Sequence, residues 1–496
     1  MKQYVIGLDL GTSGVRAVLV DENGLIVKEA TATYPLYQPY NGWAEEEGED
    51  WLNACTQVLR AVSQDVPKDC LKALGLTGQM SSVIILDKHM KPLRRAILWC
   101  DQRSEPQCRS FAQRLSLEKI KALTCSMPVV GLGATKWLWI LENEPQLAAQ
   151  THALLAPKDY VRLMLTGELA SDVEDGCGLQ LMDVPGRCWS QDVLKALEIL
   201  PKWVGKVYES HEVTGVISTS AAERTGLPAG LPVVAGTGDN GASAVGVGAL
   251  DEGDGFVTIG TSGVVYAPFT APRTDKAYCM NTMCAPTPNE WHALSSVQAS
   301  GLSMRWFRDV MFPGDNEYAA INEAVAQSPV GANGLIFLPY LMGERTPHQD
   351  AQCRGAFFGL SAPHTRSDMA RAVMEGVSLG LRDCLDVVRS TGVELKELRF
   401  CGGGSKSAVW RQMLSDVFNL PVVKGLGSAA VGAAILAAVG GGMYKTTHEA
   451  CKQMVHSADR SEPNAQNAAR YEELLSVYRL GYGAQKEISL KLASFR

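Results

Sequence analysis

Two acidic residues, Asp9 and Asp239, stand at positions that suggest a functional role for their carboxylates. Asp9 ends an apolar run and precedes a glycine-rich turn, and a bare charge there is costly unless a cation meets it. A nucleotide's Mg²⁺ would neutralise the charge of Asp9, usually through water.

Asp239 follows the apolar run 231–235 and lies between Gly238 and the Asn240-Gly241 pair. Presented at a strand end by glycines, Asp239 suits a general base that takes a proton from a substrate hydroxyl, and Asn240 can hold a neighbouring hydroxyl. A helix N-cap is the structural alternative for Asp239.

One pentapeptide, Gly-Thr-Ser-Gly-Val, occurs at 11–15 and again at 260–264, each time after a strand-like run. A turn of small residues between two strands exposes backbone N–H groups and hydroxyls, which suits contact with phosphate oxygens. Two such turns could hold a phosphate tail from both sides. The candidate phosphate-binding residues are Gly11, Thr12, Ser13, Gly260, Thr261 and Ser262. A generic glycine-rich hairpin without a ligand is the alternative.

Three other nucleotide-binding or kinase motifs are not supported by the sequence. The segment 402–407 looks like a Walker loop, but that motif needs Gly directly before Lys406, and Ser405 stands there. The segment 236–241 matches G-x-G-x-x-G, yet Asp239 would then face the pyrophosphate of a dinucleotide, which disfavours a dehydrogenase. No His-Arg-Asp loop of a protein kinase occurs.

Composition narrows the class of protein. The 496 residues predict two to four domains, and 46% hydrophobic with 20% charged residues is typical of a globular protein. The net charge of −7 and the lack of a basic run argue against a nucleic-acid partner. No run reaches the length that spans a bilayer, and the chain does not open with a signal peptide, so we expect no membrane partner and a cytoplasmic location. The 13 cysteines show no metal-binding spacing and are expected to be reduced packing residues.

The elements that must position these residues follow the same order in each half of the chain. A hairpin is expected over 4–27, and strand patterns at 73–77 and 397–401 lead into further glycine-rich or polar turns. Helices are expected at 46–64, 367–390, 407–418, 428–439 and 467–487. The apolar pattern breaks near 247–254, so we place the boundary there and expect domains 1–247 and 248–496.

In its motifs the chain resembles the FGGY carbohydrate kinases, and within that family the bacterial xylulokinases. The motifs that carry the resemblance are 9–15, Gly78-Gln79-Met80, 96–99, 157–160, 238–240, 338–348, 402–404 and 410–414. They occur in order along nearly the whole chain.

The resemblance implies a duplicated α/β fold, actin-like and ribonuclease H-like, with ATP in a cleft between two domains. By resemblance, Asp239 is the catalytic base and Asp9 orients Mg²⁺, while Arg16, Gly402 and Gly403 join the ATP-binding set. The implied sugar-binding residues are Gln79, Met80, Ser81, Trp99, Asp239 and Asn240. Trp137 is expected to pack in the core instead. No role follows for Glu344-Arg345, for which a buried ion pair is the structural alternative.

The chain departs from the xylulokinase pattern at two sugar-side positions. Ser81 replaces the usual His, and Cys100 replaces the usual Asn, while the segment 130–133 lacks an aromatic residue. Glycerol kinases carry Arg-Glu at the positions of Met80-Ser81, so glycerol is disfavoured more strongly than xylulose. We expect ATP-dependent phosphorylation of the terminal hydroxyl of a pentulose, D-xylulose above L-xylulose or ribulose. An actin-like ATPase without sugar transfer is the rival, and a homodimer is the candidate assembly.

Overall fold

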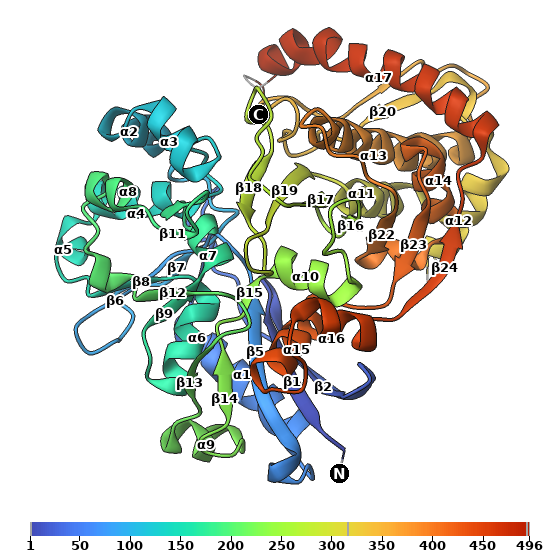
Figure 1. The fold of residues 1–496 in the computed structure, drawn as a ribbon. Helices are drawn as coiled ribbons and strands as arrows, with labels where there is room; N and C mark the ends of the chain where they lie inside the picture. The colour runs from blue at the N-terminus through green and yellow to red at the C-terminus, as the bar shows by residue number, and fades with distance from the viewer. Residues whose placement is uncertain (1, 315–316, 493–494, 496) are drawn as a thin grey trace.

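The chain folds into two α/β halves, each built around a seven-stranded sheet (Figure 1). This computed structural model describes residues 2–314, 317–492 and 495. The first sheet runs in the order β13 (Val213–Val216), β14 (Pro232–Val234), β5 (Leu71–Gly78), β1 (Tyr4–Leu10), β2 (Gly14–Asp21), β3 (Ile26–Thr33), and β15 (Thr237–Gly238) also pairs with β5. The second runs β18 (Asn281–Cys284), β19 (Trp291–Val297), β17 (Gly263–Phe269), β16 (Phe256–Ile259), β22 (Leu398–Cys401), β23 (Val422–Gly425), β24 (Ser457–Ser461).

The two sheets share one topology at their centres. In the first, β1 and β2 form the antiparallel hairpin that carries the first Gly-Thr-Ser-Gly-Val turn, β3 extends it antiparallel, and β5 pairs with β1 in parallel. In the second, β16, β17, β19 and β22 repeat these relations in the same order. The predicted duplication of the fold is confirmed.

Long helices cover the sheets close to where the sequence pattern predicts them. In the first half α1 (Gly48–Ser63) lies against β2 and β3 and contacts α6 (Pro157–Thr166). In the second half α13 (Arg366–Arg389) lies against β17 and β19, and α14 (Ala408–Phe418) and α17 (Ala465–Leu492) pack outside it. The predicted start of α14 is confirmed, because the Ser407 hydroxyl accepts a hydrogen bond from the Trp410 N–H.

One helix of the second half packs against the first sheet. α15 (Ala429–Gly440) lies on β1 and β5 and beside α10 (Asp239–Val247), and α16 (Thr447–Met454) joins it (Figure 1). Gly7 and Gly75 make this approach close enough, since a Cβ on either would collide with a backbone carbonyl of α15. The late segment 429–454 therefore completes the core beneath the first phosphate turn.

The remaining elements lie around these two sheets. A helical layer over 83–208 forms one side of the first half, and the β18–β19 hairpin of the second half reaches it through α7 (Val173–Gly178). The short strands of the first half outside its large sheet are β4 (Glu45–Glu46), β6 (Ile84–Leu86), β7 (Ala96–Ile97), β8 (Ala153–Leu155), β9 (Ala170–Asp172), β10 (Met182–Asp183), β11 (Cys188–Trp189) and β12 (Lys206–Tyr208). The other helices are α2 (Glu105–Arg114), α3 (Leu117–Thr124), α4 (Gly133–Asn143), α5 (Pro145–Ala148), α8 (Gln191–Ala196), α9 (Thr219–Thr225), α11 (Gly301–Met311) and α12 (Glu317–Gln327), and β20 (Ile336–Leu338) pairs with β21 (Ala356–Phe358).

The cysteines agree with the sequence analysis. All 13 cysteines are free thiols, and nine of them are buried side chains that pack in the interior. Among the described residues, no helix is both long and apolar enough to cross a bilayer.

Candidate active site

Three parallel strands of the first sheet end side by side. In the register, Leu10 pairs with Gly78, and Gly78 pairs with Gly238. Since the carboxyl ends of parallel strands meet at one edge of a sheet, the residues that follow them, Gly11, Gln79 and Asp239, are brought together from three distant parts of the chain. The two predicted carboxylates and the first phosphate turn thus share one edge.

Asp9 and Asp239 influence each other's ionisation. Burial raises the pKa of Asp9 to about 6, and the charge of Arg16, which lies opposite Asp9 across the hairpin, acts in the other direction. Burial first, and then the charge of Asp9, raises the pKa of Asp239 to about 7. The pair fits a hydrated divalent cation, because Mg²⁺ prefers oxygen ligands and a positive charge would relieve the repulsion between the carboxylates.

Asp239 is the first residue of helix α10, and Gly238 occupies the N-cap position. The N-cap alternative for Asp239 is therefore wrong. Its Oδ1 accepts a hydrogen bond from Asn240 Nδ2 at 2.9 Å, so the two residues expected to contact one substrate lie together. Asn240 Nδ2 also lies 3.8 Å from the sulfur of Met80, which places Met80 beside them.

Gln79 is held from several sides and is 2% exposed. Its amide nitrogen donates to Glu46 Oε2 at 2.7 Å, and the Trp51 indole donates to the same oxygen at 2.8 Å. Its amide oxygen accepts from Thr12 Oγ1 at 3.4 Å, and Trp99 Nε1 donates to that hydroxyl at 3.0 Å. Gln79 and Trp99 are therefore fixed against the first phosphate turn, and burial raises the pKa of Glu46 to about 7.

Met80 and Ser81 fill the space between two helices. A Cβ on Gly238 would lie 2.5 Å from both Cγ and Sδ of Met80, so the glycine before Asp239 leaves room for this side chain. Ser81 is buried with a backbone φ of 64°, and its hydroxyl would lie 3.2 Å from a Cβ on Gly178 in α7. The position where Ser replaces the usual His is thus enclosed by α7.

A buried polar chain supports the strand that leads to Asp239. The Thr237 hydroxyl donates to the Glu174 carboxylate, whose other oxygen lies 3.3 Å from Nε2 of His292 in the second half. Burial raises the pKa of Glu174 well above its usual range and lowers that of His292 to about 3. The imidazole is therefore neutral at neutral pH, and burial favours the protonated form of the Glu174 carboxyl. Sequence reasoning missed both residues, because neither belongs to one of the motifs singled out.

An ion cluster lies beneath the same strand. Lys158 Nζ lies 2.6 Å from Asp159, 2.7 Å from Asp172 and 3.2 Å from Asp175, all buried. These acidic side chains could be mistaken for a metal site, but the ammonium occupies the position where an ion would bind. Lys158 and Arg162 both donate to the Ala235 carbonyl, so the cluster anchors the chain just ahead of Thr237 and Asp239.

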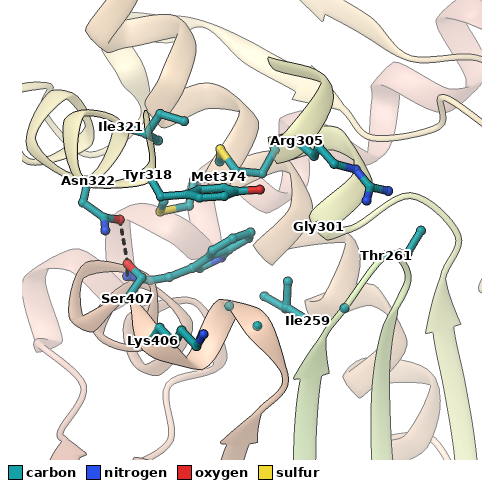
Figure 2. A pocket seen from close by; sticks show the side chains of 15 residues that line it. Ile259, Thr261, Gly301, Arg305, Tyr318, Ile321, Asn322, Met374, Lys406 and Ser407 are labelled. Atoms are coloured by element: carbon teal, nitrogen blue, oxygen red, sulfur yellow. Dashed lines mark hydrogen bonds between the residues drawn. The ribbon is translucent and has the colours of Figure 1, made fainter. Parts of the chain in front are cut away.

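The second turn borders a cavity of about 380 Å³ in the second half (Figure 2). Of the predicted ATP-binding residues, Gly260, Thr261 and Gly403 line it. The other lining residues are Ile259, Gly301, Met304, Arg305, Tyr318, Ile321, Asn322, Met374, Gly404, Lys406, Ser407 and Trp410. A volume of this size with apolar walls and few polar groups suits a flat heterocyclic base with its sugar.

Side chains that the sequence analysis missed dominate this cavity. Figure 2 shows the Arg305 guanidinium turned toward Thr261, and Tyr318 and Lys406 on opposite sides of the space. Asn322 accepts a hydrogen bond from Ser407 Oγ at 2.8 Å. Arg305 lies one helical turn after Gly301, whose N–H donates to the Gly260 carbonyl at 2.9 Å, so a contact between distant segments, which the sequence does not reveal, brings it to the second turn.

The remaining predicted ATP-binding residues occupy mixed positions. Gly402 has a φ of 79°, and a Cβ there would lie 2.6 Å from Thr258 Oγ1, so glycine is required for the turn itself. Arg16 forms an ion pair of 2.6 Å with Glu29. Ser13 is exposed at the tip of the first turn.

Trp137 and the Glu344-Arg345 pair can also be placed. Trp137 is 1% exposed and donates to the Leu197 carbonyl, so its predicted packing role is confirmed. Within the described residues Glu344 and Arg345 form no ion pair of their side chains, because Glu344 Oε1 accepts the backbone N–H groups of Gln298 and Arg345. The ion-pair alternative is wrong.

Fold and site together define a duplicated two-domain α/β protein with a carboxylate pair on one phosphate turn and a nucleoside-sized cavity on the other. Residues 4–246 match the N-terminal domain of the FGGY family of carbohydrate kinases, and residues 255–441 match the C-terminal domain. The chain belongs to this family, and it is a phosphotransferase that acts on an alcohol group of a sugar.

Individual relatives are similar over their full lengths. The xylulose kinase of Bacillus subtilis (strain 168) is 34% identical over 100% of this chain and 99% of the relative. A gluconokinase from the same organism is 29% identical over 96% of this chain and 95% of its own. A ligand-bound xylulose kinase structure from Lactobacillus acidophilus covers 99% of this chain and 100% of that one with a TM-score of 0.93 and 27% identity.

Proposed function

We propose that this sugar kinase transfers the γ-phosphoryl group of ATP to the terminal hydroxyl of a pentulose, with D-xylulose yielding D-xylulose 5-phosphate. The observation that carries the proposal is the shared edge of β1, β5 and β15, where Asp239 lies next to the first phosphate turn. The similarity to xylulose kinases along the full length favours this acceptor over glycerol. L-xylulose and ribulose remain the alternative ketoses, and the similarity to a gluconokinase adds gluconate.

In this proposal Asp239 is the general base. Its Oδ takes the proton of the acceptor hydroxyl while that oxygen forms the new bond to the γ-phosphorus, and the bond from this phosphorus to the β–γ bridging oxygen breaks to release ADP. A pKa near 7 in the free protein keeps Asp239 basic enough to accept a proton and ionised in a large fraction of molecules at neutral pH. Asn240, hydrogen-bonded to the same carboxylate, orients it.

The two phosphate turns would hold the triphosphate from opposite sides. Backbone N–H groups and hydroxyls of 11–13 and 260–262 are the proposed donors, with the nucleoside in the cavity beside Gly403. Mg²⁺, when bound near Asp9 through water, would neutralise charge on the phosphates. Closure of the two halves would exclude water, because hydrolysis of ATP is the competing reaction.

Domain limits and assembly belong to the same proposal. We assign the sugar side and base to 1–247 and the nucleoside side to 248–496, with α15 and α16 lying structurally on the first sheet. A homodimer in the cytoplasm is the proposed state, and light scattering of the purified protein tests the assembly.

The test is sugar-dependent release of ADP. The purified chain, ATP and Mg²⁺ are assayed with D-xylulose, L-xylulose, D-ribulose, L-ribulose, D-gluconate and glycerol, and the product is identified by mass. We expect the highest kcat/KM with D-xylulose. A higher kcat/KM with another compound of the panel would make that compound the acceptor in place of D-xylulose. ATP consumption that none of the compounds stimulates would favour an actin-like ATPase and overturn the proposal.

A further inference from the structure

Arg345 is a cationic side chain of the second half that points at the sugar side of the first half. It lies in the loop after β20, and its guanidinium carbon is 5.7 Å from the centre of the Trp99 ring. Its Nη2 would lie 3.5 Å from a Cβ on Gly131. Trp99 in turn donates to Thr12 in the first phosphate turn. Arg345 therefore reaches across the two halves to the predicted acceptor site.

The loop that carries Arg345 is anchored independently of its side chain. Glu344 Oε1 accepts the N–H groups of Arg345 at 2.7 Å and of Gln298 at 2.8 Å. Thr346 Oγ1 donates to the Cys279 carbonyl at 2.8 Å. These contacts hold the backbone of the loop without using the guanidinium.

No carboxylate pairs with that guanidinium within the described residues. In the described part of the chain Arg345 forms no ion pair, although the charge of the neighbouring Glu344 acts on it and partly offsets the lowering of its pKa by burial. A second cation, Lys136, is buried nearby, and burial first, with a smaller contribution from the charge of Arg345, lowers its pKa to about 7. Lys136 donates to the Val130 and Leu132 carbonyls on both sides of Gly131 and so fixes that segment. Among the described residues the Arg345 guanidinium therefore contacts the Trp99 ring and forms no hydrogen bond or ion pair.

We propose that Arg345 is a substrate-positioning residue that donates hydrogen bonds to the oxygens at the end of the acceptor away from the phosphorylated hydroxyl. A guanidinium presents parallel N–H groups that match two neighbouring oxygens, as a hydroxyketone or a carboxylate offers them. Since Arg345 belongs to the second half and Trp99 to the first, the acceptor would contact both halves, and its binding would favour closure. This inference rests on the proposed function.

Steady-state kinetics of Arg345→Gln and Arg345→Lys test it, with Arg470→Gln, an exposed arginine on α17, as the matched control. Each variant is assayed with whichever panel acceptor the wild-type protein phosphorylates best, and its melting temperature is checked first. We expect Arg345→Gln to raise the KM for the acceptor about 10- to 100-fold, as loss of a charged hydrogen-bond donor would, with the KM for ATP within about twofold. The acceptor KM of Arg345→Lys should lie between those of the wild type and Arg345→Gln, and the acceptor KM of Arg470→Gln should match that of the wild type.

An unchanged acceptor KM in a folded Arg345→Gln variant would overturn the inference while leaving the kinase proposal intact. A rise confined to the KM for ATP would also overturn it and assign Arg345 to the nucleotide. If the variant does not fold, Arg345→Lys decides by the same criterion. Failure of the wild type on every acceptor would instead overturn the proposed function itself.

Discussion

The two Gly-Thr-Ser-Gly-Val turns are identical in sequence but border different sites. In the first hairpin Leu10 pairs with Val15, which leaves four residues in the turn, whereas in the second Ile259 pairs with Gly263, which leaves three. Two residues before each turn the first strand carries Asp9 and the second carries Thr258. The identical residues supply the same small, polar turn, and their neighbours decide what lies beside it.

The strands parallel to each hairpin extend this difference. β5 leads into Gln79, which is bound to Thr12 and Glu46, so the first turn is surrounded by polar groups and carboxylates. β22 leads into Gly402 and Gly403, which leave the second turn open to an apolar cavity. Duplication thus provides two turns of the same sequence, and in the proposed function divergence after the parallel strand separates the acceptor chemistry from nucleoside binding.

The largest effect is expected from Asp239→Asn on the polar side. Removing the proposed base should lower kcat by about 10²- to 10⁴-fold, while binding of ATP, followed by calorimetry, survives because its cavity lies on the other turn. Asp192→Asn, an exposed carboxylate, is the control. Near-normal turnover of the Asp239 variant would refute the base assignment.

Asp9→Asn should have the next largest effect, lowering kcat by about 10²-fold through loss of charge at the phosphates. It also changes the pH profile. In the wild type we expect kcat/KM to fall as pH drops below about 7, because Asp239 becomes protonated. The charge of Asp9 raises the pKa of Asp239, so the acid limb should move to lower pH in the variant. If the acid limb of the kcat/KM profile lay at the same pH in the variant and the wild type, the two carboxylates would not interact.

Gly403→Val tests the apolar side. A Cβ on Gly403 meets nothing closer than the Ile259 carbonyl at 3.9 Å, so the side chain can enter the cavity without disturbing the turn. We expect the KM for ATP to rise about tenfold, equivalent to about 1.4 kcal/mol, with the acceptor KM unchanged. Gly483→Val, where the added atom also has open space, is the control. An equal rise in both KM values would contradict the separation of the two sides.

Glu174→Gln should have the smallest effect and acts on stability. The raised pKa of Glu174 means that the folded protein holds a proton that the unfolded chain releases, so wild-type stability falls as pH rises above the unfolded pKa. Glu174→Gln keeps a neutral side chain and should lose less stability between pH 5.5 and 8.5 in urea unfolding. Glu174→Ala leaves Thr237 and His292 without their partner and should cost about 1–3 kcal/mol. Equal pH slopes for wild type and Glu174→Gln would show that Glu174 is ionised in the fold.

Local patterns predicted much of the secondary structure and the reactive residues. Periodicity placed α1, α13, α14 and α15 within a few residues, because the spacing of apolar side chains and a serine N-cap are encoded locally. Asp9 and Asp239 were identifiable because a charge after an apolar strand is unusual. The family resemblance, carried by short motifs in order, added the duplicated fold.

The sequence by itself determined which turns could bind phosphate and which carboxylates could react. Only the tertiary structure decided which side chains meet: Glu46 with Gln79, Glu174 with His292, and Arg345 with Trp99. It also placed α15 on the first sheet and formed the cavity beside Gly403 from separate elements. The physical reason is that strand propensity and turn chemistry act over a few neighbouring residues, whereas these contacts depend on parallel strand register and on packing between residues far apart in the chain.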